Sequence, residues 1–286
     1  MLLHFDDETP FARSLAQAAG LQPYPVQRHR FPDGELKLTL PVPLPASVVV
    51  LRSLHQPNEK LVELVLLADA ARGLGVRQLT LVAPYLAYMR QDKAFHAGEA
   101  VSQLIVGRLL ADRFDAVVTV DPHLHRVATL DEAVPARRPV TLSAAPLIGA
   151  FFAARTPQPL LLGPDAESEQ WVKAAAGGEL DYAVCTKQRQ GDQDVRIELP
   201  ARSLRGRQVV VVDDVASSGG TLIECARRAL AAGATRVDAA VTHALLDAGA
   251  EARLAHAGIQ RLVSTDSVPH SSNRIGVAGL LASALK

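Results

Sequence analysis

The chain has 286 residues, of which 48% are apolar and 21% charged, a composition typical of globular proteins. Its 30 basic and 30 acidic residues cancel, so no general field attracts nucleic acid or an anionic membrane, and neither is expected as a partner. The length is sufficient for two domains with buried cores.

The two cysteines, Cys185 and Cys225, lack the spacing of metal ligands and are too few for a disulfide framework. The first residues are acidic where a secretory signal would be apolar. No run reaches the roughly 18 apolar residues of a membrane span. The sequence therefore predicts a soluble, cytoplasmic protein.

Short β-branched segments alternate along the chain with longer segments rich in alanine and leucine. Six segments are predicted to be strands: 47–51, 79–83, 116–120, 208–212, 237–242 and 261–264. Five are predicted to be helices: 59–72, with Asn58 as its cap, 99–111, 167–176, 221–232 and 247–257. Such alternation predicts an α/β protein with parallel sheets flanked by helices.

Two segments depart from this alternation. Residues 36–40 read Leu-Lys-Leu-Thr-Leu, which predicts an antiparallel strand with one solvent-exposed face. Residues 131–139 are charged and contain two prolines, so they are predicted to be a linker. We place the domain boundary near residue 142, which divides the chain into domains 1–142 and 143–286.

The most informative segment is 209–221, which reads Val-Val-Val-Val-Asp-Asp-Val-Ala-Ser-Ser-Gly-Gly-Thr. An apolar strand leads into Asp213 and Asp214, a loop of small residues follows, and a helix is predicted to begin near Thr221. Small residues let backbone N–H groups converge on a phosphate, and the helix N-terminus adds unpaired donors. No lysine follows the glycines, so the loop is not a Walker A motif. A sugar phosphate suits the segment, with an ordinary capped turn as the alternative.

The segment resembles the motif that binds phosphoribosyl diphosphate (PRPP) in type I phosphoribosyltransferases and PRPP synthetases. The resemblance implies that Asp213 and Asp214 hold the ribose. It also implies that the loop binds the 5-phosphate of ribose 5-phosphate through Ser217, Ser218, Gly219, Gly220 and Thr221. Serine at the first loop position resembles the shorter, class II/III-like synthetases.

Two further segments resemble synthetases rather than base phosphoribosyltransferases. Phe31-Pro32-Asp33-Gly34-Glu35 resembles their Phe-x-Asp-Gly-Glu, which implies ATP contacts by Phe31, Asp33, Gly34 and Glu35. Alone, this segment predicts a hairpin turn, and both interpretations can hold. Residues 84–93 resemble Pro-Tyr-x-x-Tyr-x-Arg-Gln-Asp, which implies ATP contacts by Arg90, Gln91 and Asp92. The planar guanidinium of arginine suits phosphate oxygens, and a solvated charged loop is the alternative.

Candidate metal ligands follow two further apolar segments. His123, after 116–120, matches the metal histidine of the synthetases, and Asp165, after 160–162, matches their metal aspartate. A hard carboxylate suits Mg²⁺, so the resemblance implies magnesium as the cofactor. His125 has no implied role and is predicted to be structural.

Lys187 and Arg189 match the Lys-x-Arg of the catalytic flexible loop of synthetases. Taken alone, such a pair is usually a solvated surface. The resemblance implies that both side chains stabilise the transition state and that Arg189 also contacts ribose 5-phosphate.

The resemblance covers residues 2 to 280. It implies two tandem type I phosphoribosyltransferase-like α/β domains, the first with the ATP motifs and the second with the ribose 5-phosphate loop. It also implies a homo-oligomer, at least a dimer, with the active site between the domains. The implied activity is transfer of diphosphate from ATP to ribose 5-phosphate, giving PRPP and AMP.

Two alternatives remain open. A base phosphoribosyltransferase would consume PRPP, but it would need one such domain rather than two and no ATP motifs. A non-catalytic regulatory homologue would bind nucleotides and partners, but here the catalytic and metal-binding positions all carry the family's residues.

Overall fold

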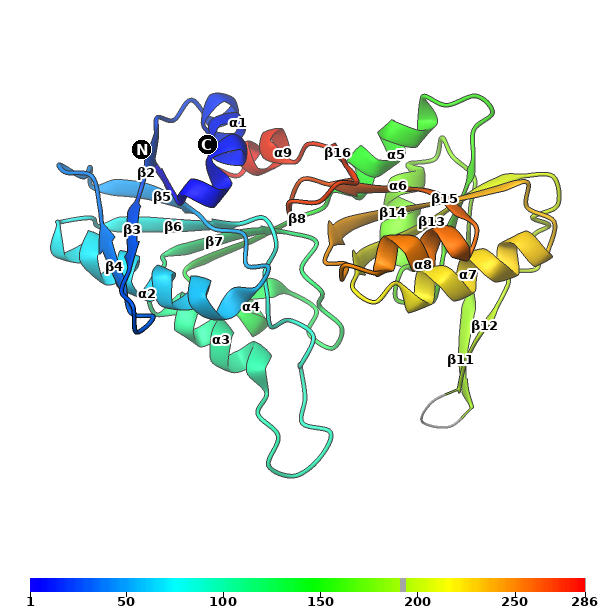
Figure 1. Ribbon diagram of the computed structural model, residues 1–286, viewed down its shortest axis with the longest axis horizontal. Helices are drawn as coiled ribbons and strands as arrows, with labels where there is room; N and C mark the ends of the chain where they lie inside the picture. The colour runs from blue at the N-terminus through cyan, green and yellow to red at the C-terminus, as the bar shows by residue number, and fades with distance from the viewer. Residues whose placement is uncertain (191–193, 286) are drawn as a thin grey trace. The chain divides into compact units, whose positions relative to one another are not determined.

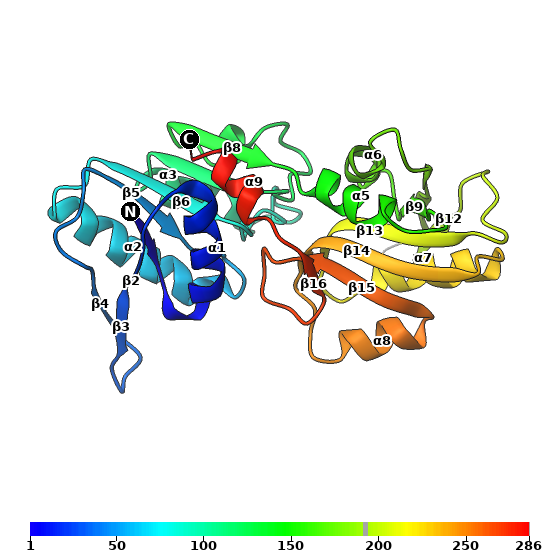
Figure 2. The same cartoon turned by 90° about the horizontal axis from the view of Figure 1, so that it is seen from above.

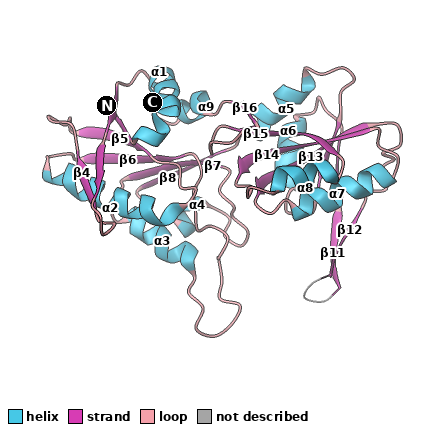
Figure 3. Ribbon diagram, in the orientation of Figure 1, coloured by secondary structure: helices cyan, strands magenta, loops and turns pink. Residues whose placement is uncertain are grey.

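The computed structural model describes residues 1–190 and 194–285, without the side chains of 187–197. The chain forms two compact units, Met1–Leu142 with Val277–Lys286, and Ser143–Gly276. Each unit contains a parallel sheet covered by helices, so the α/β prediction is confirmed (Figure 1 and Figure 3). Among the described residues, no helix combines the length and apolar character needed to cross a bilayer.

The sheet of the first unit has the strand order β2-β1-β5-β6-β7-β8, with every neighbouring pair parallel. In that order its strands are Pro23–Pro25, Leu2–His4, Ser47–Leu51, Gln78–Ala83, Ala116–Val120 and Arg138–Leu142. On one face lie α1 (Thr9–Ala19) and α9 (Ala278–Ser283). On the other lie α2 (Pro57–Gly73), α3 (Ser102–Ala111) and α4 (Leu130–Ala133) (Figure 1 and Figure 2).

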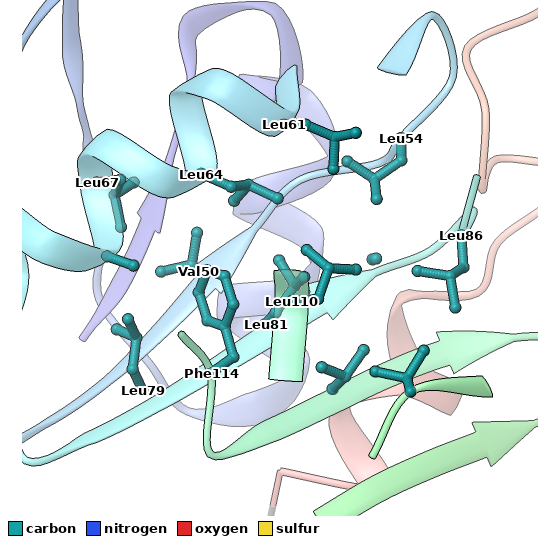
Figure 4. Close-up of a cluster of buried hydrophobic side chains, with 14 of the residues drawn as sticks. Val50, Leu54, Leu61, Leu64, Leu67, Leu79, Leu81, Leu86, Leu110 and Phe114 are labelled. Atoms are coloured by element: carbon teal, nitrogen blue, oxygen red, sulfur yellow. The ribbon is translucent and has the colours of Figure 1, made fainter. Parts of the chain in front are cut away.

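The core of the first unit forms where α2 packs on the sheet. Leu61, Leu64 and Leu67 of α2 point toward side chains of β5 and β6, including Val50 and Leu81 (Figure 4). Burying each such leucine contributes roughly 1.5–3 kcal/mol. Asn58 does not cap this helix, contrary to the prediction. Helix α2 already begins at Pro57, and the Asn58 side chain accepts a hydrogen bond from the Tyr88 hydroxyl.

A separate antiparallel hairpin joins β3 (Gln27–Arg30) to β4 (Leu36–Thr39). Residues of β4 alternate between half-buried and exposed, as predicted for a strand with one solvent-exposed face. The turn is closed by two hydrogen bonds, from Gly34 N to Phe31 O and from Phe31 N to Glu35 O. Gly34 has a φ of 96°, which glycine adopts without strain. The hairpin-turn prediction is therefore confirmed.

The predicted linker at 131–139 is wrong, because residues 131–133 belong to α4, residues 138–139 belong to β8, and all of them lie within the first unit. Thr129 and Glu132 form a capping box, so the charged residues occupy the first turn of α4. Pro135 precedes β8, and Pro139 lies within it. Pro139 is tolerated there because β8 is an edge strand and a missing N–H need not disrupt the ladder.

The sheet of the second unit has the order β10-β9-β13-β14-β15-β16 and is also parallel throughout. In that order its strands are Tyr182–Val184, Leu160–Gly163, Gln208–Ala216, Arg236–Ala244, Ile259–Thr265 and Asn273–Ile275. Val209 and Val211 pack beneath α7 (Gly220–Ala231) and α8 (Ala250–His256). Val210 and Val212 pack beneath α5 (Ala145–Ala153) and α6 (Glu169–Ala176). Burial on both faces explains the continuous apolar run.

Two elements lie outside this layered arrangement. Strands β11 (Thr186–Gln190) and β12 (Asp194–Glu198) form an antiparallel hairpin of their own (Figure 1). Helix α9 packs on α1, so Val277–Lys286 belongs to the first unit, although the sequence-based division assigns these residues to the second domain.

Candidate active site

Most candidate residues of each unit lie at the carboxyl ends of its parallel strands, the edge where ligands bind in open α/β sheets. The exceptions are residues 31–35, in the turn of the β3–β4 hairpin, and Lys187 and Arg189, in β11. In the first unit the others follow β6 and β7, which are neighbours in the sheet. In the second unit they follow β9 and β13, which are also neighbours. We describe the two groups separately.

The segment after β6 is anchored to its own unit rather than being a solvated loop. Met89 is buried, and its carbonyl accepts a hydrogen bond from Gln103 Nε2 at 3.1 Å. The backbone N–H of Gln103 donates a hydrogen bond to the backbone carbonyl of Gln91 at 3.2 Å. Tyr88, at a φ of 64°, turns the chain before it. The backbone is thus fixed while the Arg90 side chain remains exposed.

Asp92 differs from Arg90 because its carboxylate is already paired. The Asp92 side chain is only 2% exposed, and its Oδ1 lies 2.6 Å from Arg126 Nη1. Its Oδ2 lies 3.6 Å from His125 Nδ1. Both partners lie in the loop after β7, so Asp92 joins that loop to the Arg90 segment. The sequence analysis did not find Arg126.

The loop after β7 begins at Asp121, which is buried and has a φ of 37°. Its amide donates to Leu142 O at 2.8 Å, which ties the loop to the end of β8. His123 is half-buried two residues further on. Through the contacts of Asp92, the structure brings this loop next to the Arg90 segment.

The hairpin turn presents exposed side chains of Phe31, Asp33 and Glu35. Asp33 Oδ1 accepts a hydrogen bond from Glu35 N at 3.1 Å, and Phe31 packs edge-on against His29. Ion pairs from the hairpin to α2 hold it in place, one of them between Arg28 and Glu63. Arg28 also pairs with Asp6 at 2.8 Å. The side chains of the turn remain exposed and accessible for a ligand.

In the second unit, Asp213 and Asp214 are the last acidic residues of β13. Asp214 is buried, and its amide donates to Asp213 Oδ1 at 3.0 Å. Burial raises the pKa of the Asp213 carboxyl well above its ordinary value, and the charges of Asp214 and Asp165 raise it further. Asp214 and Asp165 thus lie close enough to disfavour the ionised form of Asp213.

The loop after β13 has the geometry of an anion site. Gly219 has a φ of 78°, and a Cβ atom there would lie 3.2 Å from Leu254 Cδ2, so both backbone conformation and packing favour glycine. Arg253 Nη2 donates to the carbonyl of Ser218 at 3.2 Å. The amide of Gly220 donates to Ser218 Oγ at 3.4 Å, and the next amides of the first turn of α7 have no acceptor within the helix.

Asp165 lies in a tight turn between β9 and α6. Its Oδ1 accepts a hydrogen bond from Ser168 N at 3.1 Å, and Ser168 Oγ donates to its carbonyl at 2.6 Å. The non-glycine sequence after Asp165 therefore forms a compact turn through serine. Among the described residues, no group of three or more His, Cys, Asp or Glu side chains is placed to hold a metal ion.

Lys187 and Arg189 lie two residues apart in β11, opposite Ile197 and Val195 of β12. Their side chains lie outside the part of the chain that the structure describes. The hairpin begins beside the Asp165 turn, because the amide of Cys185 donates to Gly163 O at 2.8 Å. The two cysteines are free and buried, with their Sγ atoms 3.9 Å apart.

Known proteins resemble the chain along its whole length. Residues 1–113 match the N-terminal domain of ribose phosphate pyrophosphokinase, and residues 151–276 match the phosphoribosyl transferase domain. The ribose-phosphate pyrophosphokinase of Methanopyrus kandleri is 36% identical over 293 residues, covering 100% of this chain and 98% of that protein. The chain belongs to the ribose-phosphate pyrophosphokinase family.

A second member of the ribose-phosphate pyrophosphokinase family agrees with this assignment. Ribose-phosphate pyrophosphokinase 2 of Archaeoglobus fulgidus is 38% identical over 274 residues, covering 95% of this chain and 94% of that protein. The fold is that of the phosphoribosylpyrophosphate synthetase from Mycobacterium smegmatis, with a TM-score of 0.84 at 22% identity, covering 100% and 97% of the two chains. The family and fold predicted from the sequence are confirmed.

Proposed function

We propose that the protein is a ribose-phosphate diphosphokinase, which transfers the β,γ-diphosphate of ATP to the 1-hydroxyl of ribose 5-phosphate. The products are PRPP and AMP. The observation that carries the proposal is the acidic strand end and anion loop of 213–221, in a chain that matches this family over its full length.

Ribose 5-phosphate is assigned to the second unit. The 5-phosphate accepts hydrogen bonds from the amides and hydroxyls of residues 217–221, where the dipole of α7 favours an anion. Asp213 and Asp214 accept hydrogen bonds from the ribose hydroxyls. Hydroxyl donors favour the ionised carboxylate, which offsets the burial and repulsion that raise the pKa of Asp213.

ATP is assigned to the first unit. Arg90 and Gln91 contact its phosphates and ribose, since the fixed backbone presents them beside the His123 loop. The exposed hairpin turn contacts the adenosine through Phe31, Asp33, Gly34 and Glu35. A homo-oligomer of at least two copies is also expected, and its mass in solution is measurable by sedimentation.

Magnesium fits the chemistry of the candidate ligands. Mg²⁺ is typically bound through one or two carboxylates, with waters and substrate phosphates completing its shell. Hydrogen bonds with Ser168 hold the Asp165 turn in place, and its carboxylate is a hard oxygen ligand that suits a divalent cation. His123 and Asp165 would hold the ion, which when bound stabilises charge on the phosphate oxygens.

The transfer forms a bond between the 1-oxygen of ribose 5-phosphate and the β-phosphorus of ATP. The bond from that phosphorus to the α-phosphate oxygen breaks, AMP leaves, and the proton of the 1-hydroxyl is released to solvent. Such transfers are catalysed mainly by positioning and by charge stabilisation. Lys187 and Arg189 supply cations for oxygens whose charge grows in the transition state.

The test is to incubate the purified protein with ATP, MgCl₂ and ribose 5-phosphate and to follow the products by chromatography. We expect AMP and PRPP in equal amounts, dependent on ribose 5-phosphate. Formation of ADP would show attack at the γ-phosphorus and contradict the proposal. Absence of turnover would favour a regulatory homologue, and consumption of PRPP with a free base would favour a phosphoribosyltransferase.

A further inference from the structure

Arg126 is a partly exposed arginine that is held by a buried carboxylate. Its side chain is 40% exposed, whereas that of its partner, Asp92, is 2% exposed. The 2.6 Å contact to Asp92 Oδ1 is made by Nη1, and a guanidinium group has five N–H donors. Asp92 therefore fixes the orientation of Arg126, while the exposed side of the guanidinium can bind an anion.

An exposed aromatic ring lies beside this arginine. Phe95 is 57% exposed. Its ring centroid lies 4.6 Å from Lys93 Nζ and 5.8 Å from Arg126 Cζ. Two cations and one aromatic face are thus gathered on the loops that follow β6 and β7. A nucleoside triphosphate offers both complementary features, phosphate oxygens and a planar base.

This cluster adjoins residues already assigned to ATP. Lys93 and Phe95 continue the segment that carries Arg90 and Gln91, and Arg126 lies three residues after His123. Because the Asp92–Arg126 pair joins the two loops, Arg126 is held at the same sheet edge as Arg90.

We propose that Arg126 is a further nucleotide-binding residue, which contacts the phosphates of ATP, and that Asp92 is its positioning residue. Asp92 then orients the Arg126 side chain and does not contact the nucleotide itself. Lys93 and Phe95 complete the same subsite. The inference rests on the proposed function only in taking ATP as the ligand.

A purely structural role for the pair makes a different prediction. A buried carboxylate without its cation is strongly destabilising, so Arg126 could serve Asp92 alone. Loss of Arg126 would then lower the stability of the first unit without any selective loss of ATP. Ligand binding measured separately for ATP and ribose 5-phosphate distinguishes the two roles.

The experiment is titration calorimetry of the full chain with Mg·ATP and, separately, with ribose 5-phosphate. For Arg126→Ala we expect the Kd for ATP to rise about 10- to 100-fold, as for the loss of one hydrogen bond to a charged group. The Kd for ribose 5-phosphate should change less than about twofold. Arg126→Lys keeps the charge but not the planar guanidinium. Its Kd for ATP should therefore lie between those of the wild type and Arg126→Ala.

Asp92→Asn tests the positioning role. It should weaken ATP binding less than Arg126→Ala does, and the double variant should bind ATP no more weakly than Arg126→Ala alone. Arg108→Ala, which removes an exposed arginine from α3 of the same unit, is the matched control and should bind ATP normally.

Unchanged ATP affinity in Arg126→Ala would overturn the inference, and so would equal weakening of both ligands together with a lower melting temperature. If the losses of ATP affinity in the two single variants add up in the double variant, Asp92 does not act through Arg126, and its positioning role is overturned. Because binding is measured without turnover, a wild-type protein that binds ATP but makes no PRPP contradicts only the proposed function.

Discussion

Asp213 is the residue whose environment is furthest from that of an ordinary surface carboxylate. Its half-buried carboxyl group lies near the end of a strand, where the charges of Asp214 and Asp165 repel it, and nothing in the fold alone requires this repulsion. Perturbed acids of this kind are concentrated at functional sites, where a ligand compensates for the unfavourable charge. The sugar hydroxyls and the cation assigned to this edge would supply that compensation.

Asp213→Asn should therefore act selectively on ribose 5-phosphate. The amide keeps the shape of the side chain but loses the charged acceptor, so the KM for ribose 5-phosphate should rise about tenfold or more. Steady-state kinetics with each substrate varied in turn measure this. Asp181→Asn, before β10 at the opposite end of the sheet, is the control and should be normal. A change in the KM for ATP alone would contradict the assignment of the loop.

Lys187→Ala should reduce kcat by about 100-fold or more, by analogy with the loss of one donor that stabilises transition-state charge. The Kd values of both substrates, measured by calorimetry, should change little, because the contact forms mainly in the transition state. Lys173→Ala, an exposed lysine of α6, controls for the loss of one positive charge. Near-normal turnover of Lys187→Ala would remove this residue from the mechanism.

Glu8 is a buried acid in the first unit whose titration is expected to affect stability. Its carboxylate accepts hydrogen bonds from Ser53 N at 2.6 Å and Arg52 Nη1 at 3.1 Å. Burial raises the pKa of Glu8 to about 7, against the opposing effect of Arg52. Between the ordinary value near 4.5 and about 7, the folded protein holds a proton that the unfolded chain has released.

Stability of the wild type should therefore fall, relative to Glu8→Gln, as the pH rises from 4.5 to 7, and change little above that. At about 1.4 kcal/mol per unit of pKa, the relative loss is at most about 3.5 kcal/mol. Urea unfolding of both proteins at several pH values measures it. His55, whose pKa burial lowers to about 4, contributes in the opposite direction but equally in both proteins. A constant difference between the two would contradict the raised pKa of Glu8.

At the scale of elements, strands buried on both faces were predictable from the sequence. The predicted bounds of β5 and β7 match the structure, because continuous apolar runs mark where each strand enters and leaves the core. The end of β13 was not predictable, since Asp213 and Asp214 resemble a loop. The strand continues through them because β14 is equally long and pairs Val215 with His243.

Helix starts were less predictable because acidic residues favour both first turns and preceding loops. The helix predicted from Glu99 begins at Ser102. The Glu99 carboxylate instead accepts a hydrogen bond from Phe95 N at 2.7 Å, which closes the preceding turn. Residues of the candidate site were predictable where a motif contains them. Arg126 lies in no such motif, and its proposed role depends on a contact with Asp92, 34 residues away in the chain.

Gly219, just before α7, tests whether the backbone conformation of the anion loop matters for stability and binding. Gly219→Ala should destabilise the protein by about 1–3 kcal/mol, the usual cost of holding alanine in an unfavourable φ/ψ region. Contact with Leu254 adds to this cost, and the distorted loop should bind ribose 5-phosphate less tightly. Gly220→Ala is the control for stability, since a Cβ there meets only Ser218 Oγ at 3.6 Å. Equal stability of the two variants in urea unfolding would contradict the argument.

At the scale of the whole molecule, the chain returns to its first unit after completing the second. Strand β1 begins the first unit and helix α9 completes it, with Ser143–Gly276 between them in the sequence. The unit to which ATP is assigned therefore lacks one of its helices until the last residues are present. No sequence pattern predicted this, because α9 is a short apolar segment that suits the core of either unit.

Leu281→Ala should consequently destabilise the first unit, although residue 281 follows the second unit in sequence. Leu281 is fully buried, and truncating a buried leucine costs about 2–5 kcal/mol. Leu280→Ala, at the half-buried neighbouring position, is the matched control and should cost less. Hydrogen exchange locates the effect: amides of α1 should exchange faster, whereas those of α7 should keep their protection. Faster exchange in α7 with α1 unchanged would assign the C-terminal helix to the second unit and contradict the division found in the structure.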